Sequence, residues 1–224
     1  KPVVLAPTGV AALNVKGQTI HSFFNFYTDV TPQSIRARKT KPRDTKLYKK
    51  LKTIIIDEVS MLRADMLDCI DEFLRLYGPH EDLPFGGVQM IFIGDLYQLP
   101  PVVKKEEQEI FQTHYTSEYF FSAHALADNP PEIIELQKVY RQKEQTFVDL
   151  LNKIRSNTMR ESDVKLLNSR YGIPEPDTKE GRFITLTTTN AKADEINNAE
   201  LTALKGRIHK SKAETEGDFT KEYF

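Results

Sequence analysis

The sequence has a single cysteine, Cys69, and lacks any apolar run long enough to cross a membrane. One cysteine excludes an internal disulfide and a cysteine-rich zinc site, and it suits a reducing compartment. The N-terminus shows no signal-peptide pattern, and no G-x-G-x-x-G dinucleotide fingerprint follows the first apolar run. We therefore expect a soluble protein without a membrane partner, cytoplasmic or nucleoid-associated in a bacterium and nuclear or mitochondrial in a eukaryote.

An excess of charge of one sign is lacking as well. The chain has 31 Lys and Arg against 32 Asp and Glu, for a net charge of -1. A surface for nucleic acid would therefore have to come from local clustering. The one dense basic stretch is "RARKTKPRDTKLYKKLK", from Arg36 to Lys52, which could follow a DNA backbone by counterion release. A solvated helix is the favoured interpretation, because the stretch has one tyrosine and no interleaved stacking residues.

The first half of the chain alternates apolar runs with helical periodicity. "VVL" at 3–5, "TIIID" at 53–57 and "VQMIFIG" at 88–94 are typical of buried parallel strands. A helix is predicted from "TGVAALNV", and a longer one by apolar residues at helical spacing with a stop at Gly78. The residues of that longer apolar face are Leu62, Met66, Cys69, Ile70, Phe73, Leu74 and Tyr77. The pattern indicates a doubly wound α/β domain, whose ligands lie at the carboxyl ends of the strands.

A second α/β unit is predicted to begin near residue 132. The run "EIIEL" restarts the apolar pattern, followed by helices around 147–154 and 164–167 and by the strand "RFITLTTT" at 182–189. Asn190 is predicted to cap a helix that runs to about Leu204 and is closed by Gly206. The predicted boundaries are therefore 1–131 for the first domain and 132–207 for part of the second.

Polar residues follow two of the predicted strands. Asp57 and Glu58 stand side by side after a buried strand, where an acidic pair can hold Mg²⁺ and orient water for attack on a phosphate. A solvated strand-to-helix turn explains the pair equally well. Gln98 in "GDLYQLPPV" can donate and accept at once, and Pro100 and Pro101 restrict its loop. Taken alone, that stretch is more simply an ordinary turn.

Arg141 in "ELQKVYRQ" carries a permanent planar charge suited to neutralising a transferred phosphoryl group. A surface arginine is the simpler explanation for that motif alone. The order of the three motifs strengthens the functional interpretation of Arg141. Position 98 lies 41 residues after Asp57, and Arg141 lies 43 residues after Gln98.

Four ordered segments resemble successive motifs of the Pif-type and RecD-like branch of superfamily 1 DNA helicases. They are "APTGVAALNVKGQTIHSFF", "IIIDEVSML", "PFGGVQMIFIGDLYQLPPV" and "ELQKVYRQ", and "FVDLLNKIRSN", "LLNSRY" and "TTTNAKADEINNAEL" resemble the later segments of that branch. The resemblance implies RecA-like α/β domains of the P-loop NTPase type with ATP between them. It also implies an ATP-dependent DNA helicase motor that couples hydrolysis to translocation on single-stranded DNA and to unwinding of duplex.

The resemblance also implies the site residues. Asp57 would coordinate magnesium, Glu58 would activate water, Gln98 would couple nucleotide to DNA, and Arg141 would act as an arginine finger. Single-stranded DNA would be gripped by Pro7, Thr8, Gly9, His21, Ser22, Phe24 and Asn190. Backbone amides at a strand end suit phosphates, and His or Phe rings suit bases, although core packing is the simpler role for at least one of Phe23, Phe24 and Phe26.

Two departures accompany the resemblance. None of the ten glycines is followed by lysine, so the G-x-x-x-x-G-K-[ST] phosphate loop is absent, and the branch's last motifs are absent too. We therefore interpret the chain as an internal segment that is inactive by itself, with residues 208–224 beginning an inserted small β-barrel. Self-association at an open edge of "VVL" is expected. The alternative function is a DNA-binding or scaffolding module that does not hydrolyse ATP.

Overall fold

The computed structural model describes residues 2–138, 140, 142–173, 184–204, 206, 209 and 211. The chain separates into two compact units, Lys1–Met159 and Arg160–Phe224, and each unit has its own description below. The domain boundaries predicted after residues 131 and 207 stay predictions, and residues 208, 210 and 212–224 lie outside the described part. Among the described helices, none has the length and apolarity to span a membrane.

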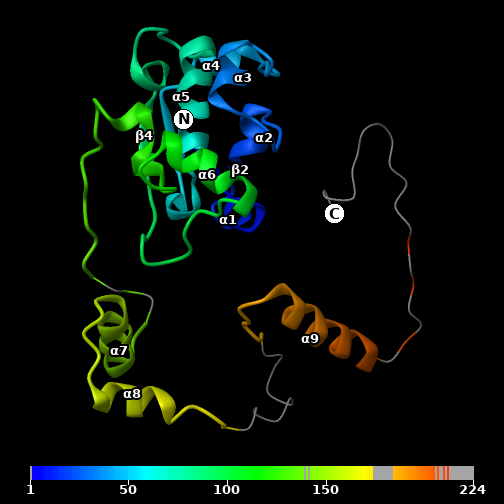
Figure 1. Ribbon diagram of the computed structural model, residues 1–224, viewed down its shortest axis with the longest axis vertical. Coiled ribbons are helices and arrows are strands. Elements are labelled where there is room, and N and C mark those ends of the chain that lie inside the picture. The colour runs from blue at the N-terminus through cyan, green and yellow to red at the C-terminus, as the bar shows by residue number, and fades with distance from the viewer. Residues whose placement is uncertain are drawn as a thin grey trace. The chain divides into compact units, whose positions relative to one another are not determined.

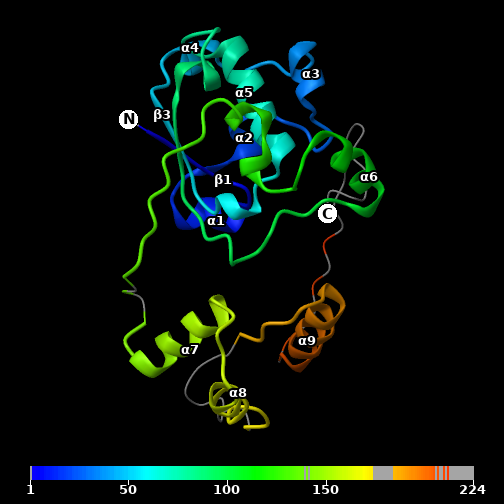
Figure 2. The same ribbon diagram turned by 60° about the vertical axis from the view of Figure 1, so that its left-hand side comes forward.

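A parallel sheet forms the centre of the first unit (Figures 1 and 2). Its strands are β1 (Val3–Ala6), β2 (Gln18–Thr19), β3 (Thr53–Ile56) and β4 (Gln89–Phe92), in the order β2-β1-β3-β4. The predicted α/β class is therefore confirmed. The open edge predicted at "VVL" is wrong, because β1 pairs with β2 on one side and with β3 on the other. β4 pairs only with β3 among the described strands.

The two faces of the sheet are buried to different degrees. Leu5, Ile54 and Ile56 point to one face and are fully buried. Ile55 is partly buried, and Ile91 and Ile93 remain 37% and 48% exposed. Since successive side chains of a strand point to opposite faces, β3 alternates between the core and a less covered face, and its predicted complete burial is wrong.

Helix α5 (Ala64–Tyr77) supplies the largest part of the core beside the sheet (Figure 1). Leu67, Ile70, Phe73 and Leu74 on its inner face are fully buried, and Gly78 caps its C-terminus as predicted. Leu62 is buried but precedes the helix. Cys69 lies on the same helix with 1% exposure, and burial raises the pKa of its thiol.

Aromatic rings join α5 to short helices nearby. The ring centroid of Phe73 lies 5.0–5.6 Å from the ring centroids of Phe24, Phe26 and Tyr48. It lies 4.8 Å from the ring centroid of Tyr77. Phe24 belongs to α2 (Ile20–Phe24), Phe26 follows it, and Tyr48 belongs to α4 (Thr45–Lys49), whereas Tyr77 ends α5 itself. Edge-to-face contacts of this kind add to the burial of the rings themselves.

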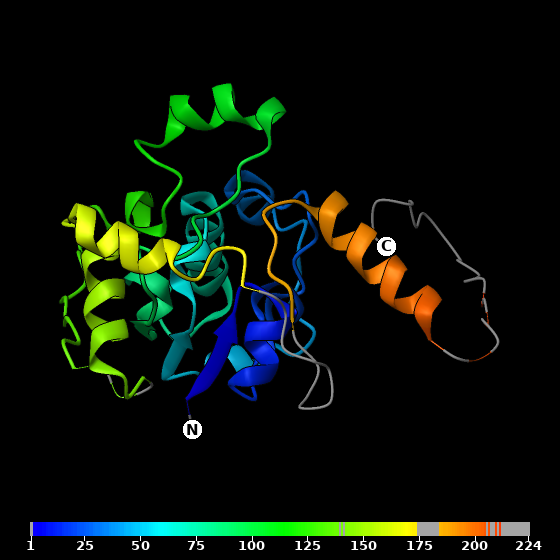
Figure 3. The same cartoon turned by 90° about the horizontal axis from the view of Figure 1, so that it is seen from below.

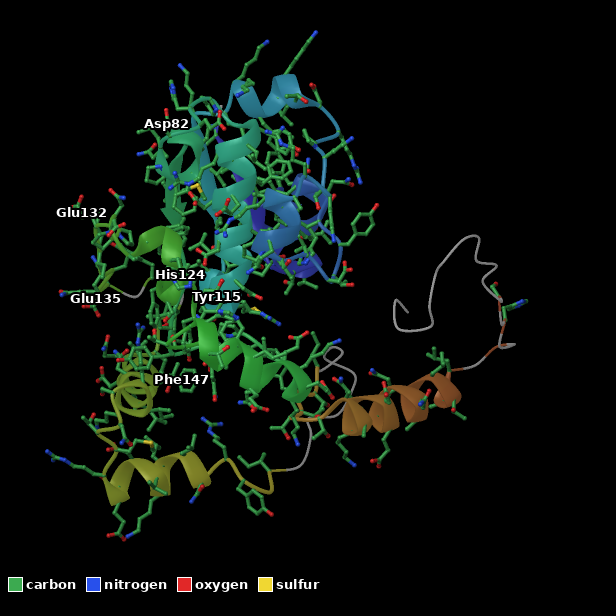
Figure 4. All side chains as sticks on the ribbon, turned by 45° about the horizontal axis from the view of Figure 1, so that its top comes forward. Asp82, Tyr115, His124, Glu132, Glu135 and Phe147 are labelled. Atoms are coloured by element: carbon green, nitrogen blue, oxygen red, sulfur yellow. The ribbon has the colours of Figure 1, made fainter. Side chains whose placement is uncertain are left out.

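Shorter elements complete the first unit. They are α1 (Gly9–Asn14), α3 (Pro32–Arg36), α6 (Lys105–His114) and α7 (Gln145–Arg155), with 3₁₀ turns η1 (Val59–Met61), η2 (Pro84–Gly87), η3 (Phe120–Ser122) and η4 (His124–Leu126). Buried Asp68 of α5 fastens η4 and the end of α6, since it accepts hydrogen bonds from the Tyr115 hydroxyl and the amides of His124 and Ala125. Tyr115 and His124 are neighbours in Figure 4, with ring centroids 5.0 Å apart.

The second unit contains α8 (Glu161–Asn168) and α9 (Asn190–Ala203), and Figure 3 shows α9 as a continuous helix. The two helices predicted near 147–154 and 164–167 are present, the first of them in the first unit. Thr189, and not Asn190, caps α9, because its hydroxyl accepts from the Lys192 amide at 3.4 Å. Residues 184–187 have no regular structure, so the strand predicted at 182–189 is wrong for the described residues. Residues 132–136, where the apolar pattern restarts, have no regular structure either.

Candidate functional site at the strand ends

The acidic pair lies in a constrained turn directly after β3. The amide of Asp57 donates to the carbonyl of Leu5 at 2.9 Å, which continues the β1–β3 ladder beyond the strand. Glu58 then takes a left-handed conformation with φ 51° and ψ 41°, which is uncommon for a residue other than glycine. The two neighbouring carboxylates therefore lie on a turn whose backbone is held by the hydrogen bond to β1.

The loop after β4 is fastened to this turn. The Val59 amide donates to the Ile93 carbonyl at 2.9 Å, and the Ile93 amide donates to the Ile56 carbonyl at 2.9 Å. Gly94 lies so close that a Cβ on it would stand 3.0 Å from the Val59 nitrogen and 3.1 Å from that of Ser60. The structure thus brings the "DE" and "GD" motifs together, and the close approach favours glycine at position 94.

Asp95 organises the loop that carries Gln98. Its Oδ1 accepts from the Tyr97 amide at 3.0 Å, and its backbone carbonyl accepts from the Gln98 amide at 3.0 Å. Gln98 Nε2 donates to Asp95 Oδ2 at 3.3 Å. Asp95 therefore supports the loop through both its side chain and its backbone. Gln98 is exposed, so its side-chain oxygen remains accessible to water or a ligand.

Arg155, at the end of α7, contacts the same loop. Its Nη2 lies 3.3 Å from Asp95 Oδ1, and its guanidinium carbon lies 4.7 Å from the centre of the Tyr97 ring. Both contacts stiffen the Gln98 loop through an ion pair and a cation–π interaction. Sequence reasoning did not single out Arg155, because one arginine at a helix end carries no signal of its own.

The acidic pair fits a magnesium ion that is held partly by other groups. Asp57 and Glu58 are half-buried and make no ion pair within the described part of the chain. The described residues contain no cluster of three metal-binding side chains, and Mg²⁺ typically uses one or two carboxylates with waters and phosphates. The buried Ser60 hydroxyl next to the pair lacks a hydrogen-bond partner among the described residues, which fits a polar ligand or water here.

The residues predicted to grip DNA surround the start of two short helices. Thr8 caps α1 by accepting from the Ala11 amide at 3.3 Å, and Gly9 beside it is exposed. Ser22 in α2 is exposed and His21 is half-buried. Phe24 is 0% exposed and stacks on Phe26, so its predicted role as a stacking face for a base is wrong. The ring fills the core instead.

Burial lowers the pKa of His21 from its ordinary value of 6.5. The unfolded chain then takes up a proton at a higher pH than the folded chain does, so stability falls as pH decreases from about 6.5 through the folded pKa. We expect His21→Gln to weaken this acid sensitivity, measured as the change in melting temperature between pH 7.5 and pH 5. His114→Gln, at an exposed position, is the control that should keep the wild-type pH dependence.

The two remaining predicted residues are placed less fully. Arg141 lies outside the described residues, so its role as an arginine finger stays a prediction. Asn190 is exposed at the first turn of α9 in the second unit. Its assignment to DNA also stays a prediction.

Comparison with known proteins decides the family. The family model described as PIF1-like helicase matches residues 1–165. The chain belongs to this family. The ATP-dependent DNA helicase PIF1 of Saccharomyces cerevisiae is 31% identical over 92% of the chain and 23% of that protein. For the mouse PIF1 helicase the identity is 32%, over 94% of the chain and 31% of that protein.

Solved structures of this family match the fold. A Pif1 helicase from Bacteroides, in complex with ADP-AlF3 and single-stranded DNA, matches with a TM-score of 0.80 and 36% identity over 92% of the chain and 48% of that one. The Pif1 helicase of Candida albicans matches with a TM-score of 0.73 and 28% identity, over 92% and 45%. The PIF1-like chain therefore spans less than half of each of these relatives.

Proposed function

We propose that this chain forms part of the motor core of an ATP-dependent DNA helicase. The observation that carries the proposal is the "DE" turn hydrogen-bonded directly to the loop of Gln98, at the carboxyl edge of a parallel sheet. That edge is where α/β folds bind their ligands. Membership of the PIF1-like family and the Bacteroides complex with ADP-AlF3 and single-stranded DNA support the same activity.

In this proposal each side chain has one task. Asp57 holds magnesium, Glu58 accepts a proton from the attacking water, and Gln98 orients that water beside the terminal phosphate of ATP. Magnesium, when bound, neutralises charge that develops on the phosphates. Arg141 supplies a further positive charge at the transferred phosphoryl group. The phosphate loop itself is absent from this sequence, so a full-length protein must supply it from another segment.

Single-stranded DNA is the proposed second ligand. Pro7, Thr8 and Gly9 follow β1 at the same edge of the sheet as the acidic pair, and exposed Ser22 can donate to a phosphate. His21 presents the exposed part of its ring, and Asn190 is a further contact. Phe24 supports this segment from the core and does not touch DNA.

Gln98→Ala in a full-length protein is expected to lower the stimulation of ATP hydrolysis by single-stranded DNA about tenfold or more, with nucleotide affinity nearly unchanged. The reason is that Gln98 orients water and does not hold the nucleotide. Arg155→Ala should produce a smaller loss of the same kind, because it frees Asp95 and the loop. Turnover with and without DNA, and nucleotide affinity by titration, are measured separately.

The control for this experiment is Arg170→Ala, which removes an exposed arginine of the second unit. A variant at Gln98 that loses nucleotide affinity and keeps its turnover would show that Gln98 binds and does not couple. Hydrolysis absent from the wild-type full-length protein would favour the alternative, a DNA-binding or scaffolding module.

A further inference from the structure

A strongly basic surface lies away from the candidate site. Residues 36–52 contain nine basic residues and one acid, Asp44, which gives this stretch a net charge of +8 (9 minus 1) in a chain whose total is -1. The remaining sequence is therefore acidic by comparison. Such segregation of charge creates a local positive field that the total conceals.

Most of these charges have no acidic partner. Arg36 pairs with Glu72 at 2.6 Å, and Lys49 donates to the Gly78 carbonyl at 2.6 Å. The other basic residues make no ion pair within the described part of the chain. These seven other basic residues form what we call the basic surface, which consists of Arg38, Lys39, Lys41, Arg43, Lys46, Lys50 and Lys52. All seven are exposed, and nitrogen-tipped side chains extend from this end of the unit in Figure 4.

The backbone beneath the basic surface is well anchored. Thr31 and Ser34 form a capping box at the start of α3, and Ile35 of that helix is fully buried. Asp44 caps α4 by accepting from the Lys46 amide at 2.9 Å. Arg43 Nε also donates to Asn25 Oδ1 at 3.2 Å. The side chains therefore project from an anchored backbone, which reduces the backbone entropy lost when the segment contacts a ligand.

The basic surface lies toward the opposite end of the sheet from the acidic pair. Lys52 directly precedes β3, whereas Asp57 directly follows it, and four strand residues span about 13 Å at ~3.3 Å each. Lys50 and Lys52 line a hollow of about 410 Å³ with His80. Glu81 and Asp82 follow His80 in the chain (Asp82 is labelled in Figure 4) and weaken the positive field there. Lys39, Lys41 and Lys46 do not line this hollow.

The chemistry of the basic surface suits phosphates and not bases. Tyr48 is the one aromatic residue of the stretch, and it is 1% exposed with its hydroxyl donating to the Phe23 carbonyl. Surfaces that bind single strands offer aromatic faces for unstacked bases. A duplex keeps its bases stacked inside and presents its phosphates, so a surface of cations alone fits a duplex.

We propose that the basic surface binds the phosphate backbone of double-stranded DNA, as a second DNA contact separate from the single-strand segment around Thr8. This proposal rests on the proposed helicase function, because the duplex that would bind here is the part of the helicase substrate that has not yet been unwound. We expect binding to be independent of sequence, because contacts to phosphates carry no sequence information.

The test compares two triple variants of the full-length protein in the absence of ATP. Lys39, Lys41 and Lys46 are changed to Gln in one, and Lys104, Lys105 and Lys143 in the matched control, which removes the same charge. Fluorescence anisotropy measures affinity for a single-stranded tail alone and for the same tail joined to a duplex, across a salt series. The melting temperature of each variant checks that it is folded.

The first variant should lose affinity for the tailed duplex, with a log–log salt slope shallower by about 1 to 3, since each phosphate that is no longer neutralised lowers the slope by ~0.9. Its affinity for the tail alone, and the affinities of the control, should stay at the wild-type values. Unchanged binding of the tailed duplex would overturn the proposal. An equal loss for both DNAs would also overturn it, in favour of a single-strand contact. This experiment uses no ATP. Its outcome therefore does not depend on the outcome of the hydrolysis experiments that test the proposed helicase function.

Discussion

Glu58→Gln in a full-length protein is expected to lower DNA-stimulated ATP turnover by a factor on the order of a hundred or more. Gln keeps the shape of the side chain and removes its capacity to accept a proton, and losses of this size follow the removal of a general base or an electrostatic contributor. Asp57→Ala should have a comparable effect through loss of the metal ligand. Steady-state hydrolysis with saturating single-stranded DNA measures both variants.

Binding of single-stranded DNA should largely survive in both variants, because the role proposed for the acidic pair is to hold metal and water and not the strand. Glu109→Gln is the matched control, since it neutralises an exposed carboxylate of α6. Turnover near the wild-type rate in Glu58→Gln would contradict the assignment of Glu58. Normal DNA binding without any turnover in the wild-type protein would instead support a module that does not hydrolyse ATP.

Phe73→Ala should give the largest loss of stability of any single change in the first unit. The ring is fully buried and contacts four other aromatic rings, so its removal leaves a cavity that rigid neighbours fill poorly. The expected loss is roughly 3–5 kcal/mol in the free energy of unfolding, a large part of the total for a domain of this size. Urea unfolding followed by circular dichroism measures it.

Two controls separate packing from the general effect of losing a phenyl ring. Phe73→Leu keeps most of the volume and should be clearly less destabilising than Phe73→Ala. Phe121→Ala removes a ring that is 49% exposed and should have a much smaller effect. Equal losses at positions 73 and 121 would mean that the aromatic cluster does not dominate the core.

The strands and the main helix could be predicted because their signals are local. The apolar runs at β1, β3 and β4 and the periodicity of α5 each lie within a short window of sequence. The rule that parallel strands present their carboxyl ends at one edge correctly placed the "DE" and "GD" motifs at the same edge of the sheet. These predictions needed no knowledge of which strands are neighbours.

The contacts between distant segments could not be predicted in this way. The left-handed turn at Glu58 and the close approach of Gly94 depend on the register between β3 and β4. A local stretch of sequence does not encode that register. A phenylalanine such as Phe24 can either fill a core or stack on a base. Only the packing of α2 on α5 shows which role Phe24 has. Arg155 contacts a loop that lies far earlier in the chain, beyond the reach of any local pattern.

The burial of Cys69 makes this chain convenient for site-specific labelling. The only thiol of the sequence is 1% exposed, and its raised pKa keeps it protonated at neutral pH, so alkylating reagents reach it slowly. A cysteine introduced at an exposed position, such as Ser22 or Lys46, would then be the one reactive handle of the segment. Fluorophores could be attached at each of the two proposed DNA contacts in turn without first replacing Cys69, and the core around α5 would stay intact.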